Sequence, residues 1–222
     1  MCGRFTQATD AEIIAKVFEL SAKPIVSRRY NIAPTQYVAA VRMGGSGREL
    51  VNLQWGLIPS WATSTSVGSS MINARGETVA EKPAFRSAFR ARRCLIVADG
   101  FYEWQKLGKA KQPYFIFFRD RRAFAFAGLW ERWQGDGHDA VESCTIVTTT
   151  ANDLVAPIHD RMPVILNPED HKFWIDPEVK EPERLLPLLR PIDPRMMDAY
   201  PVSPLVNNPA NDLPNCRVRV GK

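Results

Sequence analysis

The sequence has no long apolar run. No stretch approaches the roughly 18 consecutive apolar residues that a membrane-spanning helix needs. The first residues, MCGRFTQATD, do not form the apolar core of a secretory signal peptide. These two absences predict a cytoplasmic protein with no part inserted in a membrane.

Cysteine is scarce, and its spacing is not that of a metal site. The four cysteines stand at positions 2, 94, 144 and 216, and no pair has zinc-finger or CxxC spacing. The sequence therefore predicts no metal, no cofactor and free thiols in a reducing compartment. Cys94 and Cys144 lie within the apolar runs RCLIVAD and SCTIVTTT, which is typical of cysteines packed in a core.

A strong excess of one charge is also missing. The chain has 29 basic and 24 acidic residues, a net charge of +5, which is compatible with a basic groove but does not identify a nucleic-acid-binding protein. The 17 prolines, about 8% of the chain against a usual value of about 5%, predict many turns. With 222 residues, 45% hydrophobic, and no linker-like stretch, we expect a single domain over residues 1–222.

Apolar spacing predicts a small number of short helices. Residues 9–12 (TDAE) resemble a capping box, and the apolar residues after them predict a helix over residues 10–18. Further helices are expected within residues 84–92, after the Asn167-Pro168 pair, and within residues 181–190.

Runs rich in β-branched and aromatic residues predict more strands than helices. They cover residues 37–41, 49–53, 94–98, 114–118, 123–127, 144–149 and 163–166, with 200–206 and 217–220 as final strands. Residues 28–34 (RRYNIAP) are expected as an extended loop, because the residue before a proline is biased away from helix. Strands that do not alternate regularly with helices predict an α+β domain with a barrel-like, mainly antiparallel β-sheet flanked by helices.

Position 2 carries the first residue that indicates a chemistry. A small second residue such as Cys2 favours removal of Met1, and the product carries an α-amine and a thiol on one residue. Reference pKa values of about 7.7–8.0 and about 8.5 leave both groups partly nucleophilic at neutral pH. An aldehyde would give a Schiff base with the amine, and the thiol would then close a five-membered thiazolidine ring. The alternative is a cysteine that stands at the terminus by chance.

Three internal segments contain polar residues of catalytic type. Residues 71–78 (MINARGET) carry Asn73, residues 98–104 (ADGFYEW) place Glu103 in or just after a turn, and residues 158–163 (IHDRMP) carry His159. Each has an ordinary alternative. Asn73 would be a loop cap, Glu103 a solvated carboxylate and His159 a packed histidine.

These segments occur in a fixed order with four other motifs. The others are CGRF at residues 2–5, YNIAP at 30–34, WGLIPSW at 55–61 and VSPLVN at 202–207. In this combination the chain resembles the SRAP family, the SOS-response-associated peptidases that shield abasic sites. The resemblance extends from residue 2 to about residue 208.

The resemblance implies a fold, a substrate and a mechanism. The fold is one α+β domain on a bifurcated, barrel-like sheet, and the substrate is an abasic site in single-stranded DNA, met during the DNA damage response. The mature N-terminal cysteine would attack the sugar aldehyde at C1′ and end as a thiazolidine DNA–protein crosslink. The family's nucleophile falls on Cys2, and its active-site asparagine, glutamate and histidine fall on Asn73, Glu103 and His159. Ala62 stands where some relatives have a second tryptophan, which affects how DNA is wedged at this edge.

Each of these side chains suits one step of the implied reaction. A carboxylic acid such as Glu103 can carry a proton from the amine to the departing hydroxyl group. His159, with its near-neutral reference pKa, suits the opening of the sugar ring. Asn73 can hold the α-amine or the thiazolidine by hydrogen bonds.

Other residues are candidates for DNA binding. Arg4 and Arg75 are candidate phosphate clamps, because a guanidinium group can grip two phosphate oxygens. The alternative for Arg75 is an ion pair with Glu77 or Glu81. We expect three side chains to stack on or wedge between bases: Pro34, Trp61 and Trp104. For an aromatic side chain such a contact is worth about 1–3 kcal/mol per base.

Two other functions stay open. Cys2, with its own amine as base and Asn73 as oxyanion donor, could act as an N-terminal-nucleophile amidohydrolase or peptidase, and removal of Met1 would then be autocatalytic. A non-covalent nucleic-acid-binding module is compatible with the net charge, but it gives Cys2 no reason to stand at position 2. We expect a monomer whose partners are single-stranded DNA with abasic sites and proteins of the replication fork.

Overall fold

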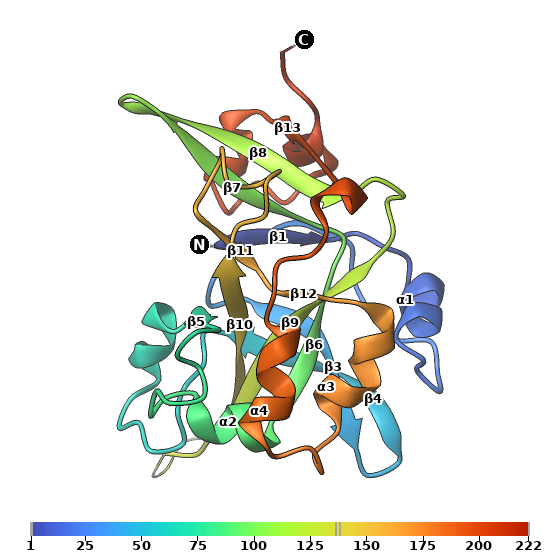
Figure 1. Cartoon of the computed structure of the whole chain (residues 1–222), viewed down its shortest axis with the longest axis vertical. Coiled ribbons are helices and arrows are strands. Elements are labelled where there is room, and N and C mark those ends of the chain that lie inside the picture. The colour runs from blue at the N-terminus through green and yellow to red at the C-terminus, as the bar shows by residue number, and fades with distance from the viewer. Residues whose placement is uncertain (1, 136, 138, 222) are drawn as a thin grey trace.

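The computed structural model describes residues 2–135, 137 and 139–221, and its strands form two sheets (Figure 1). The smaller sheet, at the top of Figure 1, has the strand order β13-β8-β7-β1-β2. Its strands are β1 (Arg4–Gln7), β2 (Arg29–Ile32), β7 (Gly100–Leu107), β8 (Ala110–Phe118) and β13 (Met197–Pro201).

The larger sheet closes on itself. Its circuit runs through β10 (Val141–Thr150), β4 (Gly47–Trp55), β3 (Tyr37–Gly44), β6 (Arg93–Ala98) and β9 (Phe124–Trp133), and β9 pairs again with β10. Within this circuit the β10–β4 pairing is parallel and the other pairings are antiparallel. The short strands β5 (Asn73–Arg75), β11 (Arg161–Pro163) and β12 (Ile165–Leu166) extend it. The closed circuit confirms the predicted α+β fold with a barrel-like, mainly antiparallel sheet.

Short helices pack on the outside of the barrel. They are α1 (Ala11–Val17), α2 (Arg86–Ala91), α3 (His171–Ile175) and α4 (Pro182–Leu185). Short 3-10 helices cover residues 65–70, 168–170, 186–188, 194–196, 204–207 and 214–217. The helices bury Ile14, Phe89, Trp174 and Leu185 in one apolar cluster with the barrel. Within the described residues, no helix has both the length and the apolar character to cross a membrane.

A second apolar cluster lies between the two sheets and is centred on β1. The buried Phe5 ring lies edge-on to Trp55 and to Phe126, with ring centroids 5.2 and 5.6 Å apart. Such pairs contribute about 0.5–1.5 kcal/mol each beyond the area they bury. Cys94 and Cys144 are buried in this same cluster, which confirms their predicted place in the core.

The chain passes from the barrel to the smaller sheet at Asp99, between β6 and β7. The Thr6 hydroxyl donates to one oxygen of the Asp99 carboxylate. The backbone N–H of Ala8 and the hydroxyl of Thr9 donate to the other oxygen, at 2.8 and 3.1 Å. A buried carboxylate with several donors is held in place, since moving it would leave polar groups unpaired. The crossing point is therefore fixed to the end of β1.

The predicted helix over residues 10–18 is confirmed as α1, but the prediction of a capping box at its start is wrong. Asp10 occupies the N-cap position and its side chain makes no capping hydrogen bond. Its carboxylate pairs with Arg28 instead, and Glu12 pairs with Lys23. Cations outside the helix thus compete for the carboxylates that a capping box would use.

The chain ends differ most from the predicted strands. The expected strand over 200–206 ends at Pro201, because Ser203 accepts a hydrogen bond from the backbone of Leu205 and begins a 3-10 turn. The expected strand over 217–220 is reduced to a single bridge between Val202 and Arg219. Both expectations were wrong. The strands β1, β2, β5 and β7 were not predicted, and β2 lies within the expected loop 28–34.

Arg93 joins the barrel to the helices. Its buried guanidinium donates to the carbonyl oxygens of Phe89 and Val179 at 2.7 and 2.8 Å, and also to those of Trp174 and Asp176. The carbonyls of Phe89, Trp174 and Asp176 lie at the ends of α2 and α3, where a helix leaves oxygens without partners, and that of Val179 lies in the loop after α3.

We expect Arg93→Ala to lower the free energy of unfolding by about 3 kcal/mol or more, because it leaves several buried carbonyls without donors. Urea unfolding measures the change. The control is Arg90→Ala, an exposed arginine on α2, which should change stability by less than about 0.5 kcal/mol. Equal effects of the two substitutions would contradict this role for Arg93.

Candidate active site at the start of the chain

Strands β1 and β7 bring the start of the chain to Glu103. Their register pairs Arg4 with Tyr102 and Phe5 with Phe101, so one further step places Gly3 opposite Glu103. The prediction that Glu103 lies in or just after a turn is wrong. It lies in the middle of β7 and is 2% exposed, because the turn after β6 consists of Asp99 alone.

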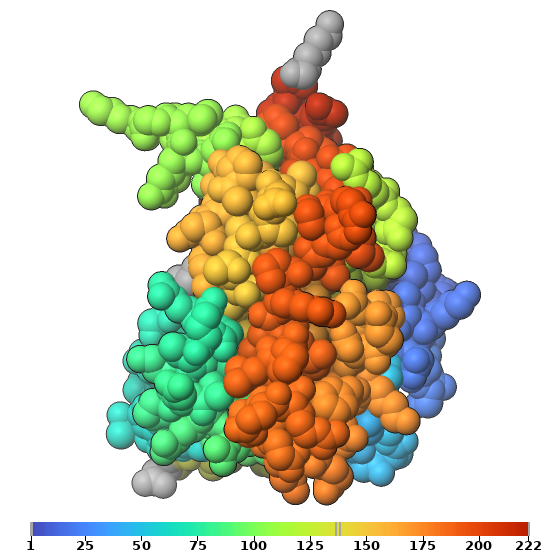
Figure 2. All heavy atoms as spheres, in the orientation of Figure 1, coloured from blue at the N-terminus to red at the C-terminus, as the bar shows by residue number. Residues whose placement is uncertain are grey.

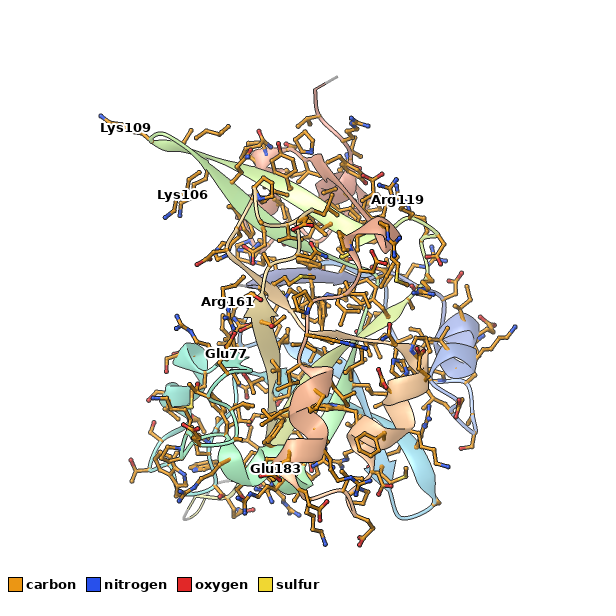
Figure 3. The ribbon with its side chains drawn as sticks, viewed as in Figure 1. Glu77, Lys106, Lys109, Arg119, Arg161 and Glu183 are labelled. Atoms are coloured by element: carbon orange, nitrogen blue, oxygen red, sulfur yellow. The ribbon has the colours of Figure 1, made fainter. Side chains whose placement is uncertain are left out.

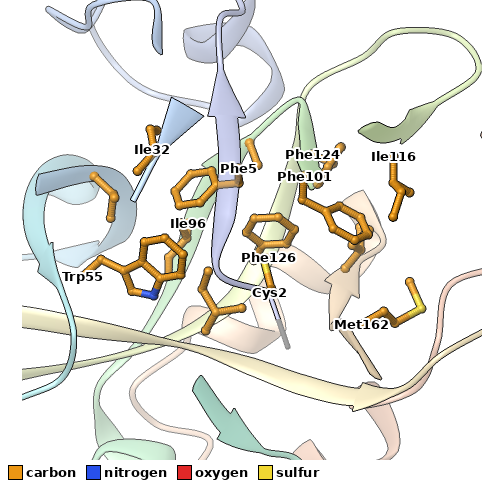
Figure 4. Close-up of a cluster of buried hydrophobic side chains, with 14 of the residues drawn as sticks. Cys2, Phe5, Ile32, Trp55, Ile96, Phe101, Ile116, Phe124, Phe126 and Met162 are labelled. Carbon is orange, nitrogen blue, oxygen red and sulfur yellow. The ribbon is translucent and has the colours of Figure 1, made fainter. Parts of the chain in front are cut away.

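Cys2 is fully buried. Figure 4 shows its side chain among Phe5, Phe126 and Met162, in the cluster between the two sheets. Burial raises the pKa of the Cys2 thiol far above its usual range, and the nearby Glu103 carboxylate raises it further. The thiol is therefore protonated at neutral pH, since a thiolate would be poorly solvated here. Burial thus opposes the partly nucleophilic thiol that the sequence predicts for the mature terminus. Met1 and its removal lie outside the described residues.

Asn73 contacts Cys2 directly. It is the first residue of β5 and is paired with Ile146 of β10, so a sheet fixes its backbone. Its side-chain Nδ2 donates to the carbonyl oxygen of Cys2 at 2.9 Å. Its Oδ1 is buried and accepts no hydrogen bond within the described residues. A buried amide oxygen without a donor lowers the stability of the fold by about 1–3 kcal/mol. Its retention beside Cys2 therefore indicates a functional role for Asn73.

Glu103 is poised to exchange a proton. Burial raises the pKa of its carboxyl group from 4.5 to about 7. At neutral pH the acid and its conjugate base are both present in similar amounts. A general acid–base catalyst works best under this condition.

His159 lies in the loop between β10 and β11. Its Nδ1 accepts a hydrogen bond from the backbone N–H of Arg161 at 3.0 Å, which favours a neutral ring with the proton on Nε2. The Asp160 carboxylate lies 2.8 Å from the same nitrogen and favours the protonated ring. Burial outweighs this attraction and lowers the pKa of His159. The imidazole is therefore neutral at physiological pH.

A groove of about 350 Å³ leads away from His159. Its walls are Trp104, Gln105 and Lys106 of β7 on one side and residues 156–160 on the other. Gln105 Nε2 donates to the Pro157 carbonyl at 3.0 Å and joins the two walls. The predicted base-stacking residue Trp104 thus lies in the same groove as the predicted catalytic residue His159.

Two hydrogen bonds of Asn207 connect Trp104 to β1. The indole Nε1 of Trp104 donates to Asn207 Oδ1 at 2.8 Å, and Arg4 donates to the Asn207 carbonyl at 3.1 Å. The Arg4 guanidinium also donates to Asn31 Oδ1 at 2.9 Å and to the Val206 carbonyl at 2.7 Å. Arg4 therefore joins β1, β2 and the segment 204–207, and these contacts compete with its predicted role as a phosphate clamp.

Arg75 has a different environment. It is exposed, and within the described part of the chain its side chain has no hydrogen bond or ion pair. The alternative partner Glu77 is taken by Arg161, whose two terminal nitrogens bind the carboxylate at 2.7 and 2.9 Å (Figure 3). Sequence reasoning missed this pair, although Arg161 stands only two positions after His159. Arg75 remains available for an anion from outside.

The other predicted DNA-binding residues lie at the surface. Trp61 is 63% exposed, and Pro34 is half-buried just after β2. The structure brings Cys2, Asn73 and Glu103 together, with His159 and Trp104 beside them. No group of three or more His, Cys, Asp or Glu residues suited to a metal ion occurs among the residues that are described.

These features define a class of protein in which the candidate nucleophile, Cys2, lies at the start of the chain. The core strand β1 that follows it holds it in place. The chain belongs to the SRAP family, because the family model described as SOS response associated peptidase matches residues 1–209.

Relatives and solved structures agree with this assignment. Abasic site processing protein YoqW of Bacillus subtilis is 44% identical over 218 residues, which cover 96% of this chain and 97% of YoqW. Abasic site processing protein HMCES of Xenopus tropicalis is 33% identical over 198 residues, which cover 79% of this chain and 58% of HMCES. A crystal structure of a protein from Bacteroides thetaiotaomicron has a TM-score of 0.88 and 28% identity, over 99% of this chain and 100% of that one.

The raised pKa of Glu103 predicts a pH-dependent stability. Because the pKa of this carboxyl group is higher in the folded state, folding favours its protonated form. Its contribution to the free energy of unfolding is therefore lost as pH rises from about 4.5 through about 7. Relative to Glu103→Gln, the wild type should lose on the order of 3 kcal/mol between pH 4 and pH 8. Urea unfolding of both proteins across this range measures it. The exposed control Glu178→Gln should track the wild type, and a constant gap between wild type and Glu103→Gln would contradict the burial argument.

Proposed function

We propose that this protein recognises abasic sites in single-stranded DNA and forms a covalent thiazolidine crosslink through the mature Cys2, which shields the lesion. The observation that carries the proposal is the contact of Cys2 with Asn73, beside a Glu103 whose pKa is about 7. The relatives named abasic site processing proteins support the choice of lesion.

Removal of Met1 would turn the amide nitrogen of Cys2 into an amine. An amine at this position can donate a hydrogen bond to Asn73 Oδ1, the buried oxygen that lacks a donor in the described structure. Asn73 would then hold both the carbonyl and the amine of Cys2, and the nitrogen lone pair would point in a fixed direction. Such positioning raises the effective concentration of the reacting groups.

The amine attacks first, because the buried thiol is protonated. Its nitrogen adds to C1′ of the open-chain sugar, and Glu103 takes a proton from nitrogen and gives one to the hydroxyl group, which leaves as water. The thiol then adds to the carbon of the resulting imine. An S–C1′ bond forms, the imine nitrogen receives the proton, and the product is a thiazolidine plus one water. Glu103 can relay the thiol proton to this nitrogen during the second step.

His159 acts before the amine does. An abasic sugar is mostly closed as a cyclic hemiacetal, and opening it requires protonation of the ring oxygen and loss of the hydroxyl proton. A neutral imidazole beside the groove can do the second, because its lowered pKa keeps it unprotonated near pH 7. This role fits its place in the groove wall that faces β7.

Amide hydrolysis is the second function considered. It would require a Cys2 thiolate as nucleophile, and burial opposes that charge. An aldehyde can be attacked by the neutral amine, whereas an amide carbonyl is much less reactive. The site therefore favours condensation with an aldehyde over hydrolysis of a peptide.

Cys2→Ala tests the order of the two nucleophiles. It retains a small second residue, so Met1 is still removed and the amine forms an imine, but no thiol captures it. We expect the wild type to give an adduct with abasic single-stranded DNA that survives heating on a denaturing gel. The variant should give little heat-stable adduct, a borohydride-trapped adduct, and strand cleavage at the lesion by β-elimination.

The control removes the amine instead of the thiol. An uncleaved N-terminal extension turns the amine into an amide and should abolish both adducts, whereas the same extension at the C-terminus should not. A heat-stable adduct with Cys2→Ala would mean that the thiazolidine is not the product. No adduct with the mature wild type would overturn the proposed function itself.

Arg75 and Arg4 should respond differently to substitution. Arg75→Gln should make the salt dependence of binding to single-stranded DNA shallower by about 0.7 in the slope of log K against log salt, because one phosphate contact is lost. Arg4→Gln should mainly lower the melting temperature, since it frees carbonyls that Arg4 now binds. The exposed Arg90→Gln is the charge-matched control for binding. An unchanged slope with Arg75→Gln would remove this residue from the DNA interface.

A further inference from the structure

The hairpin formed by β7 and β8 projects from the body of the protein. Figure 2 shows it standing out at the upper left, away from the surface around it. At its base β7 pairs with β1 through Tyr102, and β8 pairs with β13 through Tyr114. Beyond these positions, residues 105–112 of the described chain form strand pairs only with each other. The side chains of Gln105 and Gln112 also donate to the carbonyls of Pro157 and Val202. Gly108, at φ 60°, forms the tight turn at the end.

The end of this hairpin is basic. Lys106, Lys109 and Lys111 are exposed, and residues 104–113 contain no acidic residue. None of the three lysines has a hydrogen bond or an ion pair with another residue in the described ranges. Figure 3 shows Lys109 at the tip, and Lys106 below the hairpin on the side toward Arg161 and Glu77.

The arrangement of two of these lysines is unfavourable for the isolated protein. Lys106 and Lys111 are direct cross-strand partners, so their side chains leave the same face of the hairpin. Like charges in directly opposite positions destabilise a strand pair, and a two-stranded ribbon is only marginally stable by itself. An anion bound between the lysines would remove this repulsion.

The hairpin is continuous with the candidate active site. Lys106 lines the groove that also contains Trp104 and His159. Glu103 stands on the same strand, three residues before Lys106. A strand of about 6 residues from Glu103 to the tip extends roughly 20 Å. A chain of phosphates that leaves the lesion along the groove would meet Lys106 and then the lysines of the tip.

We propose that the β7–β8 hairpin binds the phosphate backbone of the single strand that continues from the lesion, with Lys106, Lys109 and Lys111 as its phosphate contacts. The inference rests on the proposed function for the position of the lesion. It adds a second binding site that acts on affinity and leaves the chemistry at Cys2 unchanged. It also predicts that binding depends on the length of the strand.

The test compares two triple variants with equal loss of charge. One is Lys106→Gln, Lys109→Gln and Lys111→Gln; the control is Lys16→Gln, Lys172→Gln and Lys180→Gln, three exposed lysines of the region around α1 and α3. Binding to undamaged oligo(dT) is measured against salt concentration, with strands of about 5 and about 25 nucleotides. For the long strand the hairpin variant should have a slope shallower by about 2, as expected for three lost contacts on a single strand. For the short strand it should match the control.

Crosslinking at saturating DNA and thermal melting complete the experiment. A Lys109→Gln, Lys111→Gln double variant, which keeps Lys106 in the wall of the active-site groove, should crosslink at the wild-type rate when DNA is saturating. The triple hairpin variant should melt at the same temperature as the wild type or higher, because the Lys106–Lys111 repulsion is gone. Equal slopes of the two triple variants on the long strand would overturn the inference. So would self-association of the hairpin variant with unchanged DNA binding, which would assign the lysines to protection of the open strand edges. A wild type that binds oligo(dT) through these lysines but forms no adduct would overturn the proposed function and leave the hairpin site standing.

Discussion

Strand β1 is paired on both edges, with β7 and with β2, and the geometry of the site depends on this pairing. A chain terminus is ordinarily the most mobile part of a domain. Here Phe5 is packed between Trp55 and Phe126, and Asp99 holds the far end of the strand. The residue two positions before the strand is thus placed relative to Glu103 with the accuracy of a sheet register. Cys2, near the start of the chain, therefore has the rigid surroundings of a core residue.

Burial acts in one direction on each titratable group of the site. It raises the pKa values of Cys2 and Glu103 and lowers that of His159, so the neutral form is favoured in all three. In a site built from ion pairs, the charged partners would each keep one protonation state. A site of neutral groups exchanges protons with little rearrangement, which suits a reaction in which protons move repeatedly between nitrogen, oxygen and sulfur.

The sequence was sufficient for the barrel, but not for the geometry of the candidate site. Long apolar runs such as 94–98 and 144–149 have strand character of their own, and β6 and β10 contain them. Strand β7 was missed, because Gly100 and Glu103 are depleted in strands and only the pairing with β1 and β8 makes them extended. The order of the motifs led to the prediction that Asn73 and His159 are site residues. The Arg161–Glu77 pair joins positions 84 residues apart, and no local pattern encodes it.

The enclosure of Cys2 has a consequence for selectivity. A free cysteine amine and thiol condense with almost any small aldehyde, so an exposed one would soon be capped by metabolites. In this fold the thiol sits in the core as S–H. If Cys2 reacts as proposed, only an aldehyde held in place long enough for the amine to react would be captured. Under the proposed function, discrimination would arise from the time that the aldehyde stays at the site: the DNA on either side of the lesion would keep its aldehyde there, while a small free aldehyde diffuses away. A slowly reacting Cys2 would therefore select aldehydes that stay bound over aldehydes that diffuse away.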